Sequence, residues 1–474
     1  MQSNGEQAQA QYVEGNRRMA TGDADGAESC YRQALALDPL HGAARANLGY
    51  LKEQQGALPE AEEHYRKALA LLPHAVQLYQ NLGVLLLKQK RFAESESALR
   101  DAVAVAPSSS AAWRDLGVLL ACLQHDDEAE QCYHRALALT STDGDVARIQ
   151  FNLAYILMRQ GRWTEGWPLL ETRWQFERLK QSLDGPCWQG ESLSGRSLLI
   201  VQDAGHGDLL HFCRYALLAK EQGALRIAIY CHPALKPLLA TMPGIDKVLA
   251  FDEAATDERW DFWTLPMSMP QWFGATPDNV PTSGYLQADA ALAAAWRARL
   301  PAQGLRVGLA WKGNPNFEND ADRSLPSLET LAPLASQLAA SASAGGPAVH
   351  FVSLQRGEGE EEALDPPHGM ALQAIGPQLR DFADTAAVIA NLDLVISVDS
   401  AVAHLAGAMG KPVWLLLPDY RCDWRWLTGR ADTAWYPSMR LFRQAAGSGE
   451  ARLGWRAVVD EVARTLAEWR SAAV

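Results

Sequence analysis

The sequence lacks the features that mark several protein classes. No apolar run approaches the roughly 20 residues that a membrane-spanning helix needs. The first residues, MQSNGEQAQAQ, contain neither the basic nor the apolar segment of a secretory signal peptide. The net charge of −13 at pH 7 argues against sequence-independent nucleic-acid binding and leaves no polybasic membrane anchor. We therefore expect no membrane span and no nucleic-acid partner.

Cysteines and metal ligands are also sparse. The seven cysteines are scattered and form no CxxC pair, a pattern typical of free thiols in a reducing compartment. No cluster of His, Cys, Asp or Glu has the spacing of a metal site, so we expect no metal and no other cofactor. These observations predict a cytoplasmic protein. Its 474 residues suffice for about three domains.

The first part of the chain is repetitive with a period of 34 residues. The period appears in a glycine column (Gly15, Gly49, Gly83, Gly117), an alanine column (Ala34, Ala68, Ala102, Ala136) and a proline column (Pro39, Pro73, Pro107). Two further columns are interrupted, by Ser95 among alanines and by Leu99 among tyrosines. The period and residue types resemble the tetratricopeptide repeat, in which two helices pack closely through small residues.

The repeats cover residues 8–41, 42–75, 76–109 and 110–143, so we assign 1–143 to a helical solenoid. A fifth, atypical repeat begins near residue 147, shifted by three positions, and we assign 144–185 to it and to a connector. Its second helix, GRWTEGWPLLETRWQFERL, is rich in tryptophan and lacks the alanine column. We expect this unit to pack against the domain that follows.

One polar column of the repeats predicts an acceptor-binding groove. Equivalent positions carry Asn47, Asn81, Asp115 and Asn152. A carboxamide donates and accepts at once, so such a ladder could hold an extended peptide backbone without reading its sequence. The alternative is that asparagine is common at this position and bonds locally.

The second part of the chain alternates short apolar runs with helical segments. Expected strands are 197–203, 225–232, 247–251, 262–267, 305–313, 349–355, 394–399 and 412–418. This alternation predicts parallel sheets with crossover helices. A break between Pro301 and Gly304 suggests two Rossmann-like domains, 186–302 and 303–474, with a final helix at about 454–470 crossing both.

The segment LVISVDSAVAHLAGAMGKPVWLLLP, residues 394–418, predicts a ligand site. A helix follows a buried strand there, and Asp399 and Ser400 stand at its N-terminus. Such a helix N-terminus can hold a phosphate. Alternatively, Asp399 and Ser400 only cap a structural helix. Two other acidic segments are predicted to have structural roles. We expect Asp381, Asp384 and Thr385 to cap a helix, and Glu358 to Glu362 to form a solvated helix face.

Motifs from about Trp188 onward resemble the two-domain B-type glycosyltransferases, most closely the family 9 heptosyltransferase-like proteins and more distantly the family 41 protein O-GlcNAc transferases. The motifs are the Gly205-His206-Gly207-Asp208 loop, VGLAWKGN (307–314), Arg323-Ser324-Leu325, FVSLQ (351–355), DFADT (381–385), the 394–418 segment and DWRW (423–426). The resemblance implies a solenoid followed by a twin Rossmann-like α/β region. Enzymes of this type work without a catalytic metal.

The resemblance also implies roles for individual residues. In the family, the Asp of the Gly-Asp motif is the proposed catalytic base, which corresponds to Asp208; the alternative is a helix-capping aspartate. His206 is a second base candidate, and His211 is either structural or faces the acceptor. The predicted donor-binding residues are Lys312 and Arg323 as cations, the N-terminus at Ser400 and Ala401, Gln355 toward the base, and Asp399 and His404 toward the sugar or ribose.

We therefore expect an inverting glycosyltransferase that moves a sugar from a nucleotide-activated donor to a hydroxyl of a protein recruited by the repeats. The hexosyl, heptosyl and N-acetylhexosaminyl classes are not resolved by the sequence. One alternative is a heptosyltransferase-like enzyme with a glycan or lipopolysaccharide acceptor. The other is a non-catalytic repeat scaffold with a degenerate glycosyltransferase fold. The sequence leaves open whether the protein forms a homo-oligomer.

Overall fold

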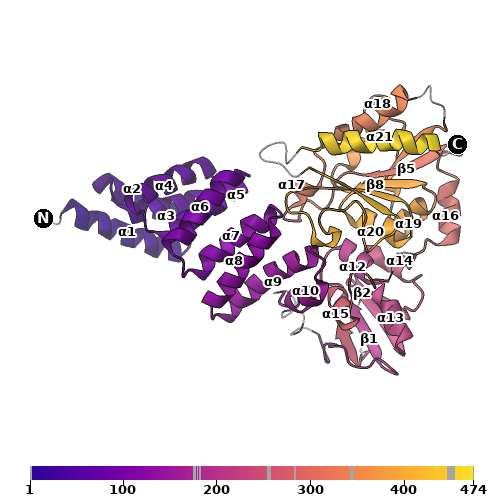
Figure 1. The fold of residues 1–474 in the computed structure, drawn as a ribbon, viewed down its shortest axis with the longest axis horizontal. Coiled ribbons are helices and arrows are strands. Elements are labelled where there is room, and N and C mark those ends of the chain that lie inside the picture. The colour runs from indigo at the N-terminus through magenta and orange to yellow at the C-terminus, as the bar shows by residue number, and fades with distance from the viewer. Residues whose placement is uncertain are drawn as a thin grey trace. The chain divides into compact units, whose positions relative to one another are not determined.

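The computed structural model describes residues 3–173, 178, 180, 183–253, 258–281, 284–341, 346–445 and 454–472. The chain divides into two compact units, Met1–Ile149 and Gln150–Val474. The first is entirely helical, and the second combines helices with two sheets (Figure 1). This division confirms the predicted class of a helical solenoid followed by an α/β region with parallel sheets. In the described part of the chain, no helix is long and apolar enough to cross a membrane.

The first unit is built from helical hairpins, one for each repeat. Its helices are α1 (Asn4–Ala20), α2 (Ala24–Leu37), α3 (Gly42–Gln54), α4 (Leu58–Leu71), α5 (Val76–Lys88), α6 (Phe92–Val105), α7 (Ser110–Cys122) and α8 (Asp126–Leu139). Each odd-numbered helix packs against the even-numbered helix that follows it, and each hairpin packs against the next. Polar caps start several helices: the Asp23 side chain accepts from the Gly26 amide, and the Ser109 side chain from the Ala112 amide.

The repeated columns explain this packing. A Cβ atom at Gly117 would lie 2.7 Å from the ring of Tyr133, and one at Gly83 would lie 2.5 Å from Leu99. Glycine is thus required where an aromatic or branched side chain of the second helix lies on the backbone of the first. Ser95, which interrupts the alanine column, donates a hydrogen bond of 2.7 Å to the Gly83 carbonyl oxygen. The interruption is therefore accommodated by a specific bond.

The second unit begins inside α9 (Asp143–Arg159), which is followed by α10 (Trp163–Leu170). Both helices contribute to one apolar core with the sheets of this unit, through Ala154, Met158, Trp163, Trp167 and Leu170. The fifth repeat is therefore part of the α/β unit. The end of its predicted second helix, at 174–177 and 179, lies outside the described residues.

Two parallel sheets form the frame of the second unit. The first has the order β3-β2-β1-β4, with β1 (Ser197–Val201), β2 (Arg226–Cys231), β3 (Lys247–Ala250) and β4 (Phe262–Thr264). Its helices are α12 (His206–Phe212), α13 (Tyr215–Glu221), α14 (Lys236–Leu239) and α15 (Met269–Trp272). All four strands fall within predicted segments, although each is shorter at its carboxyl end because the chain turns there into loops.

The second sheet has the order β10-β9-β8-β5-β6-β7. Its strands are β5 (Leu305–Ala310), β6 (Val349–Ser353), β7 (Leu372–Ala374), β8 (Leu394–Val398), β9 (Val413–Leu417) and β10 (Met439–Arg443). Its helices are α16 (Ala290–Arg297), α17 (Asp320–Arg323), α18 (Ala332–Ala340), α19 (Phe382–Ala390), α20 (Ala401–Ala408) and α21 (Arg456–Ala472). The edge strands β7 and β10 were not among the predicted strands, because neither carries a continuous apolar run.

The final helix differs from the expectation. It was predicted to cross both domains, but the main contacts of α21 are with α18, β10 and the short helix Leu328–Leu331, all of the second sheet region. Its buried residues Val458, Val462 and Leu466 share one core with Leu334 and Leu338. The apolar face of α21 packs on α18 and the second sheet region.

The predicted boundary near residue 302 also differs from the packing. Helix α16 precedes that boundary, yet it packs against α19 below the second sheet. The indole Nε1 of Trp296 on α16 donates a 3.0 Å hydrogen bond to Asp384 Oδ1 on α19. Residues from Gly284 onward thus associate with the second sheet region, since the Gly284 amide bonds the Ala408 carbonyl oxygen at 2.7 Å.

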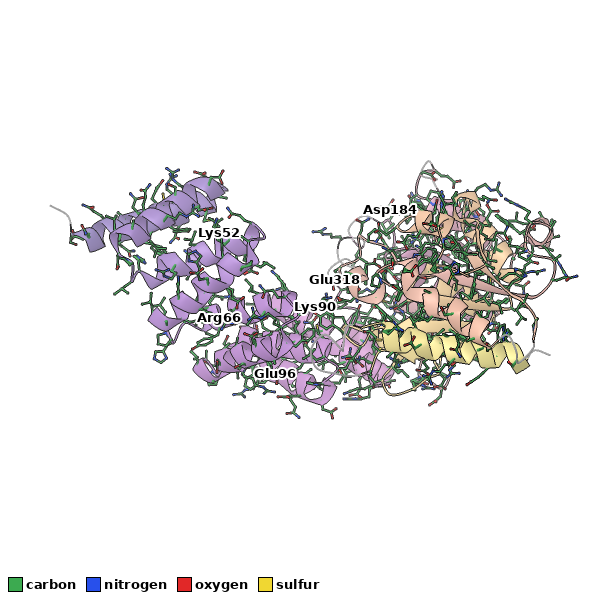
Figure 2. The ribbon with its side chains drawn as sticks, turned by 90° about the horizontal axis from the view of Figure 1, so that it is seen from above. Lys52, Arg66, Lys90, Glu96, Asp184 and Glu318 are labelled. Carbon is green, nitrogen blue, oxygen red and sulfur yellow. The ribbon has the colours of Figure 1, made fainter. Side chains whose placement is uncertain are left out.

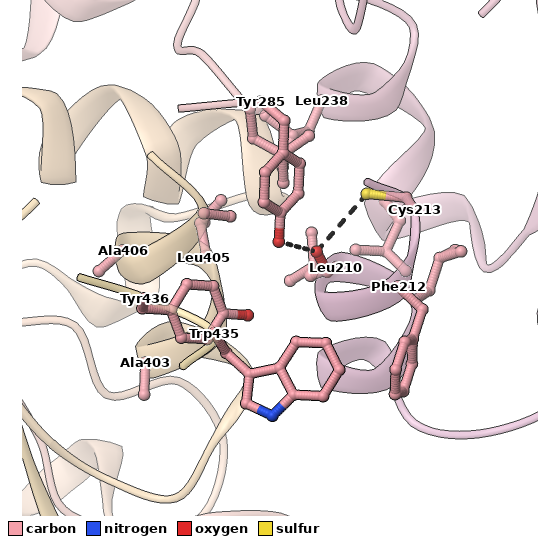
Figure 3. Close-up of a cluster of buried hydrophobic side chains, with 14 of the residues drawn as sticks. Leu210, Phe212, Cys213, Leu238, Tyr285, Ala403, Leu405, Ala406, Trp435 and Tyr436 are labelled. Carbon is pink, nitrogen blue, oxygen red and sulfur yellow. Dashed lines mark hydrogen bonds between the residues drawn. The ribbon is translucent and has the colours of Figure 1, made fainter. Parts of the chain in front are cut away.

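The two sheet regions meet through a continuous apolar core rather than across an open gap. Helices α12 and α20 pack directly against each other, and Figure 3 shows Leu210 and Phe212 from the first region facing Ala403, Trp435 and Tyr436 from the second. Arg214 is fully buried in this junction. Its guanidinium donates to the carbonyl oxygens of His211, Pro281 and Trp435 and to the Tyr285 hydroxyl, at 2.7 to 3.0 Å.

Candidate functional site

The Gly205-His206-Gly207-Asp208 loop connects β1 to α12 at the carboxyl edge of the first sheet. Gly205 precedes the helix, and its amide donates a 3.0 Å hydrogen bond to Asp208 Oδ2 in the first turn. Helix α12 begins at His206, so Asp208 lies in its first turn. Asp208 therefore does cap the helix, as the alternative reading proposed, yet its side chain keeps 27% of its surface exposed.

A buried arginine meets this carboxylate from the other sheet region. Arg425 Nη2 lies 2.5 Å from Asp208 Oδ1, and Arg425 Nη1 lies 2.9 Å from Asp423 Oδ2. Its side chain is only 6% exposed and lies over the rings of Phe212 and Trp424. Burial alone would lower the pKa of Arg425, but Asp423 and Asp208 raise it above its ordinary value. The three groups form a charged cluster in which both carboxylates share one cation.

Asp399 lies between β8 and α20, next to Ser400. Its Oδ2 accepts a 2.9 Å hydrogen bond from the Trp426 indole, and its Oδ1 lies 3.7 Å from His404 Nε2. Burial raises the pKa of Asp399 to about 6, with a further contribution from Asp423. The structure therefore brings Asp399 and His404 together, with Trp426 stacked on the His404 ring at 5.4 Å between centroids.

His404 and His211 meet at the junction of the two sheet regions. Their Nδ1 atoms lie 3.3 Å apart, and the Tyr436 hydroxyl lies 2.9 Å from His211 Nδ1 and 3.1 Å from His404 Nδ1. Burial lowers the pKa of both imidazoles well below the ordinary value, and Arg214 lowers both further. His211 Nε2 is buried without a hydrogen-bond partner in the described residues. Both rings are thus internal: His211 is fully buried and His404 is 6% exposed.

The N-terminus of α20 is the predicted phosphate site. Ser400 precedes the helix, but its side chain makes no capping bond and instead lies 3.0 Å from Ser397 Oγ. A Cβ atom at Gly207 would lie 3.0 Å from the His404 ring and 3.5 Å from Ala401 Cα. The glycine loop and the α20 N-terminus are therefore in direct contact, which brings Ser400 and Ala401 next to the Asp208 loop.

The two predicted cations differ in their surroundings. Arg323 donates from Nε to Asp320 Oδ1 at 3.1 Å and lies over the Phe317 ring, and its charge acts on both Asp399 and His404. Lys312 Nζ instead lies 3.6 Å from Glu362 and 3.8 Å from Glu358. Arg323 is therefore the cation with the closer link to the α20 segment.

Gln355 is tied to the backbone around it. Its Oε1 accepts from the amides of Trp311 and Lys312, both at 3.0 Å, and its Nε2 donates to the Glu358 carbonyl oxygen at 2.8 Å. These bonds join the ends of β5 and β6 and leave little capacity for a ligand. The acidic run beside it is also not simply solvated, because Glu362 accepts from the Trp311 indole and the Leu328 amide.

His206 lies at the carboxyl edge of the first sheet, apart from the His404 pair. Its ring is 4.6 Å from the His232 ring and 5.5 Å from the Phe382 ring, between centroids. Burial lowers the pKa of His206, and the neighbouring His232 lowers it further. Among the described residues, no three His, Cys, Asp or Glu side chains are grouped as a metal site would require.

Sequence reasoning missed Arg425 and Asp203. Arg425 stands between two tryptophans in DWRW, and a charged residue in such an apolar context was the available signal. Asp203 follows β1, and its Oδ2 lies 3.5 Å from Arg173 Nη2, which comes from the end of the fifth repeat. Burial raises the pKa of Asp203 to about 6 despite the opposing effect of Arg173. Asp203 thus adds a second buried carboxyl group near Asp208.

The predicted groove residues all lie on the first helix of their repeats and are half-buried: Asn47 on α3, Asn81 on α5, Asp115 on α7 and Asn152 on α9. Asn47 Nδ2 donates to Asn16 Oδ1 at 2.7 Å, and Asn81 Oδ1 accepts from Gln77 at 2.8 Å. Asp115 accepts from Gln80 at 2.7 Å and from Arg114. Local bonds of the kind that the alternative predicted are therefore present, and a bound peptide would have to share or replace them.

Comparison with solved structures gives partial likenesses, each covering little more than a third of this chain. A crystal structure of MamA has a TM-score of 0.32 and 21% identity, covering 36% of this chain and 97% of MamA. The pilF structure of Pseudomonas aeruginosa has a TM-score of 0.34 and 22% identity, covering 37% of this chain and 78% of that one. YrrB, described as a tetratricopeptide-repeat protein with an unusual peptide-binding site, has a TM-score of 0.31 and 19% identity, covering 36% and 91%.

Sequence comparisons extend into the α/β unit. The chain is 29% identical over 325 residues to Protein FlbA of Caulobacter vibrioides, covering 63% of this chain and 52% of FlbA. It thus spans about half the length of that relative. Tetratricopeptide-repeat families match residues 12–76 with 123–171, and 52–119. Glycosyltransferase family 9 (heptosyltransferase) matches residues 336–416, which include β8 and α20. The chain therefore joins tetratricopeptide repeats to a C-terminal glycosyltransferase family 9 domain.

Proposed function

We propose that this protein transfers a sugar from a nucleotide-activated donor to a hydroxyl of a protein acceptor, with inversion at the sugar carbon. The observation that carries the proposal is the Asp208–Arg425–Asp423 cluster beside the α20 N-terminus of the glycosyltransferase domain. Such a site supplies a carboxylate for the acceptor, and amides with a cation for the leaving phosphate. The absence of a disulfide among the seven cysteines, all of which lie in the described residues, fits the cytoplasmic location that we also propose.

In the proposed displacement, Asp208 takes the proton of the acceptor hydroxyl. Each of its oxygens already accepts one hydrogen bond, from Gly205 or from Arg425. A carboxylate oxygen can accept a second bond, so the acceptor hydroxyl can approach while both existing bonds orient the group. The acceptor oxygen then forms a bond to the sugar carbon as the bond to the leaving phosphate breaks. His206 is the second base candidate.

The donor side comprises the α20 N-terminus and the residues around it. The first-turn amides after Ser400 have no side-chain cap, which suits an incoming anion. Of the two predicted cations, Arg323, which is paired with Asp320, is the candidate for neutralising the leaving phosphate, and Lys312 would first have to leave its glutamate neighbours. Asp399 and His404 are proposed to orient the sugar or ribose from one side of this segment. Gln355 would act indirectly, by fixing the strand ends.

Transfer to protein is tested by comparing cells that express the wild type with cells that express Asp208→Asn. Intact-mass spectrometry of co-purified proteins should show an added sugar mass with the wild type, and the added mass identifies the sugar class. The variant should reduce the modified fraction by about 100-fold or more, the loss typical of a missing general base. Asp432→Asn is the matched control, because Asp432 forms an exposed ion pair with Arg430 outside the site.

Each outcome separates the alternatives. Equal modification by wild type and Asp208→Asn would remove Asp208 as the base. Sugar on a glycan and never on protein would favour the lipopolysaccharide-type acceptor. Donor turnover that is absent in every preparation would favour a non-catalytic scaffold.

Recruitment by the repeats is tested separately with Asn47→Ala combined with Asn81→Ala. We expect a reduced modified fraction of the protein acceptor and unchanged hydrolysis of the donor by water. Gln33→Ala with Gln54→Ala is a control of similar chemistry outside the proposed ladder. If the ladder variant modifies the acceptor as well as the wild type, the ladder has no part in selection.

A further inference from the structure

We propose that Trp426 positions the Asp399 carboxylate for the donor, by a hydrogen bond from its indole N–H and by stacking on the neighbouring His404. This inference rests on the proposed function, since Asp399 is there proposed to orient the sugar or ribose of the donor. Trp426 touches no reacting atom in this scheme, so it is a positioning residue. It makes the DWRW turn, residues 423–426, the element that holds a carboxylate on each side of the site.

The first observation is the contact between Trp426 and Asp399 itself. Trp426 Nε1 donates a 2.9 Å hydrogen bond to Asp399 Oδ2, and both residues are buried, with 0% and 9% of their surface exposed. The Trp426 ring also stacks on His404, at 5.4 Å between centroids and 23° between planes. One side chain therefore fixes an oxygen of Asp399 and also the imidazole whose Nε2 lies 3.7 Å from the other oxygen.

The second observation is that the turn carrying Trp426 is itself held in place. The Asp423 side chain accepts a 2.9 Å hydrogen bond from the Arg425 amide and so caps the short helix Trp424–Trp426. On the other side, Arg443 of β10 donates from Nη2 to the Trp426 carbonyl oxygen. The indole is thus presented to Asp399 from a fixed backbone.

The third observation is that the same turn reaches the opposite carboxylate. Arg425, which directly precedes Trp426, pairs with Asp208 of the first sheet region, whereas Trp426 bonds to Asp399 of the second. Asp208 is the proposed base for the acceptor, and Asp399 is the proposed donor-orienting group. Two successive side chains of one turn therefore hold the two carboxylates in place relative to each other.

The chemistry of this bond favours the ionised carboxylate, which can accept a hydroxyl of the donor. An indole N–H only donates, so it stabilises the charged form of Asp399. Burial and Asp423 act against it and raise the pKa of Asp399 to about 6. Loss of the indole bond should therefore let Asp399 keep its proton to a higher pH. The other titratable or charged side chains that act on Asp399 are His404 of α20, Arg323 of α17, and Cys422 and Arg425 of the loop after β9.

The first test needs no donor and compares Trp426→Phe with the wild type by urea unfolding of the full chain at pH 5 and pH 8. The variant keeps an aromatic ring but loses the N–H, so its urea midpoint should fall. The fall should be larger at pH 8, because Asp399 is ionised there and its charge has lost a donor. In an Asp399→Ala background, the same substitution should lower the midpoint equally at both pH values.

Trp188→Phe is the matched control for unfolding. It also removes one buried indole hydrogen bond, of 2.8 Å, but the acceptor is the Glu191 carbonyl oxygen, which does not titrate. Its fall in urea midpoint should not depend on pH. A fall of the Trp426→Phe midpoint that is equal at pH 5 and pH 8 overturns the inference, because a packing role alone would produce it.

The second test measures the donor. A panel of UDP-, GDP-, ADP- and CMP-activated sugars identifies the one that the wild type hydrolyses with water. The KM for that donor at pH 7 should rise about tenfold in Trp426→Phe, as expected for one lost hydrogen bond to a charged group, and should not change in Trp188→Phe. An unchanged KM in Trp426→Phe overturns the inference. A wild type that hydrolyses no donor and modifies no protein contradicts the proposed function instead, and the unfolding test still decides whether Trp426 holds Asp399.

Discussion

Arg66 in the repeats and Arg425 and Arg214 in the α/β unit lie in contrasting surroundings. Arg66 (labelled in Figure 2) lies 2.9 Å from both Glu62 and Glu94, and the Arg66 and Glu94 side chains are 49% and 48% exposed. In the α/β unit, Arg425 and Arg214 are buried, and Arg214 has only neutral hydrogen-bond acceptors. Surface pairs contribute little and cost little, whereas buried charge is costly to keep. The cost of keeping Arg425 buried beside two carboxylates therefore supports the proposed site around it.

The units differ in the same way in their use of glycine. Gly49, Gly83 and Gly117 make the same contact in three successive repeats, each against a large side chain of the partner helix. Gly207 makes its contact once, against His404 and Ala401 of a distant segment. The repeat glycines thus stabilise the same helix pair in each repeat, whereas Gly207 fixes one contact between its loop and α20.

The largest expected effect comes from breaking a buried charge. Arg425→Met leaves Asp208 and Asp423 without their shared cation, so we expect the α/β unit to lose about 3–5 kcal/mol of stability and the protein to lose transfer activity. Arg66→Met in the repeats should cost about 0–1 kcal/mol. Differential scanning calorimetry of the two variants measures both values. Similar losses in both would show that burial is not what separates the units.

The next effect concerns the glycine column. Gly117→Ala pushes a Cβ atom into the Tyr133 ring, and we expect a loss of about 1–3 kcal/mol in the repeat unit from overpacking. Gly144→Ala is the control, since no atom lies within 4 Å of its added Cβ. Urea unfolding followed by circular dichroism compares them. A control that destabilises as much as Gly117→Ala would indicate a general intolerance of substitution.

The buried histidines predict a pH effect confined to the α/β unit. The pKa of His404 is lowered on folding, so its contribution to stability is complete above the unfolded value near 6.5 and is lost as pH falls below it. We expect the stability difference between wild type and His404→Gln to change by about 2 kcal/mol between pH 6.5 and pH 5. Urea unfolding at both pH values tests this. A difference that stays constant with pH would mean that His404 is not neutral in the fold.

The smallest expected effect comes from replacing Ser95, the residue that interrupts the alanine column of the repeats. Ser95→Ala removes the hydroxyl that bonds the Gly83 carbonyl oxygen and returns alanine to its column. We expect a change of at most about 1.5 kcal/mol, because a buried hydrogen bond is lost while the small apolar contact is kept. Thermal unfolding compares it with Ser29→Ala on the surface of α2. A loss well above that figure would make the interruption essential to the third repeat.

The sequence predicts what depends on local periodicity. The 34-residue period leads directly to the helical hairpins, and apolar runs locate strands β1 to β6, β8 and β9. The edge strands β7 and β10 escape this reasoning because they carry no continuous apolar run, whereas the edge strands β3 and β4 do carry one.

The sequence predicted only some of the residues in the candidate site. Asp208 and the α20 segment follow from their motifs, and the structure brings Asp399 and His404 together. The pairing of Arg425 with Asp208 joins residues more than 200 positions apart, and no local pattern encodes it. The residue type of Gln355 suggested a ligand, but its amide is engaged by backbone groups that only folding brings near.

The surroundings of Arg214 have a mechanical consequence. Its guanidinium is bonded to the backbone of both sheet regions and of the segment between them, and among the described residues it pairs with no carboxylate. Moving one region against the other would break several of these bonds at once. Arg214 therefore fixes the register of the two regions, which a non-directional apolar contact could not do.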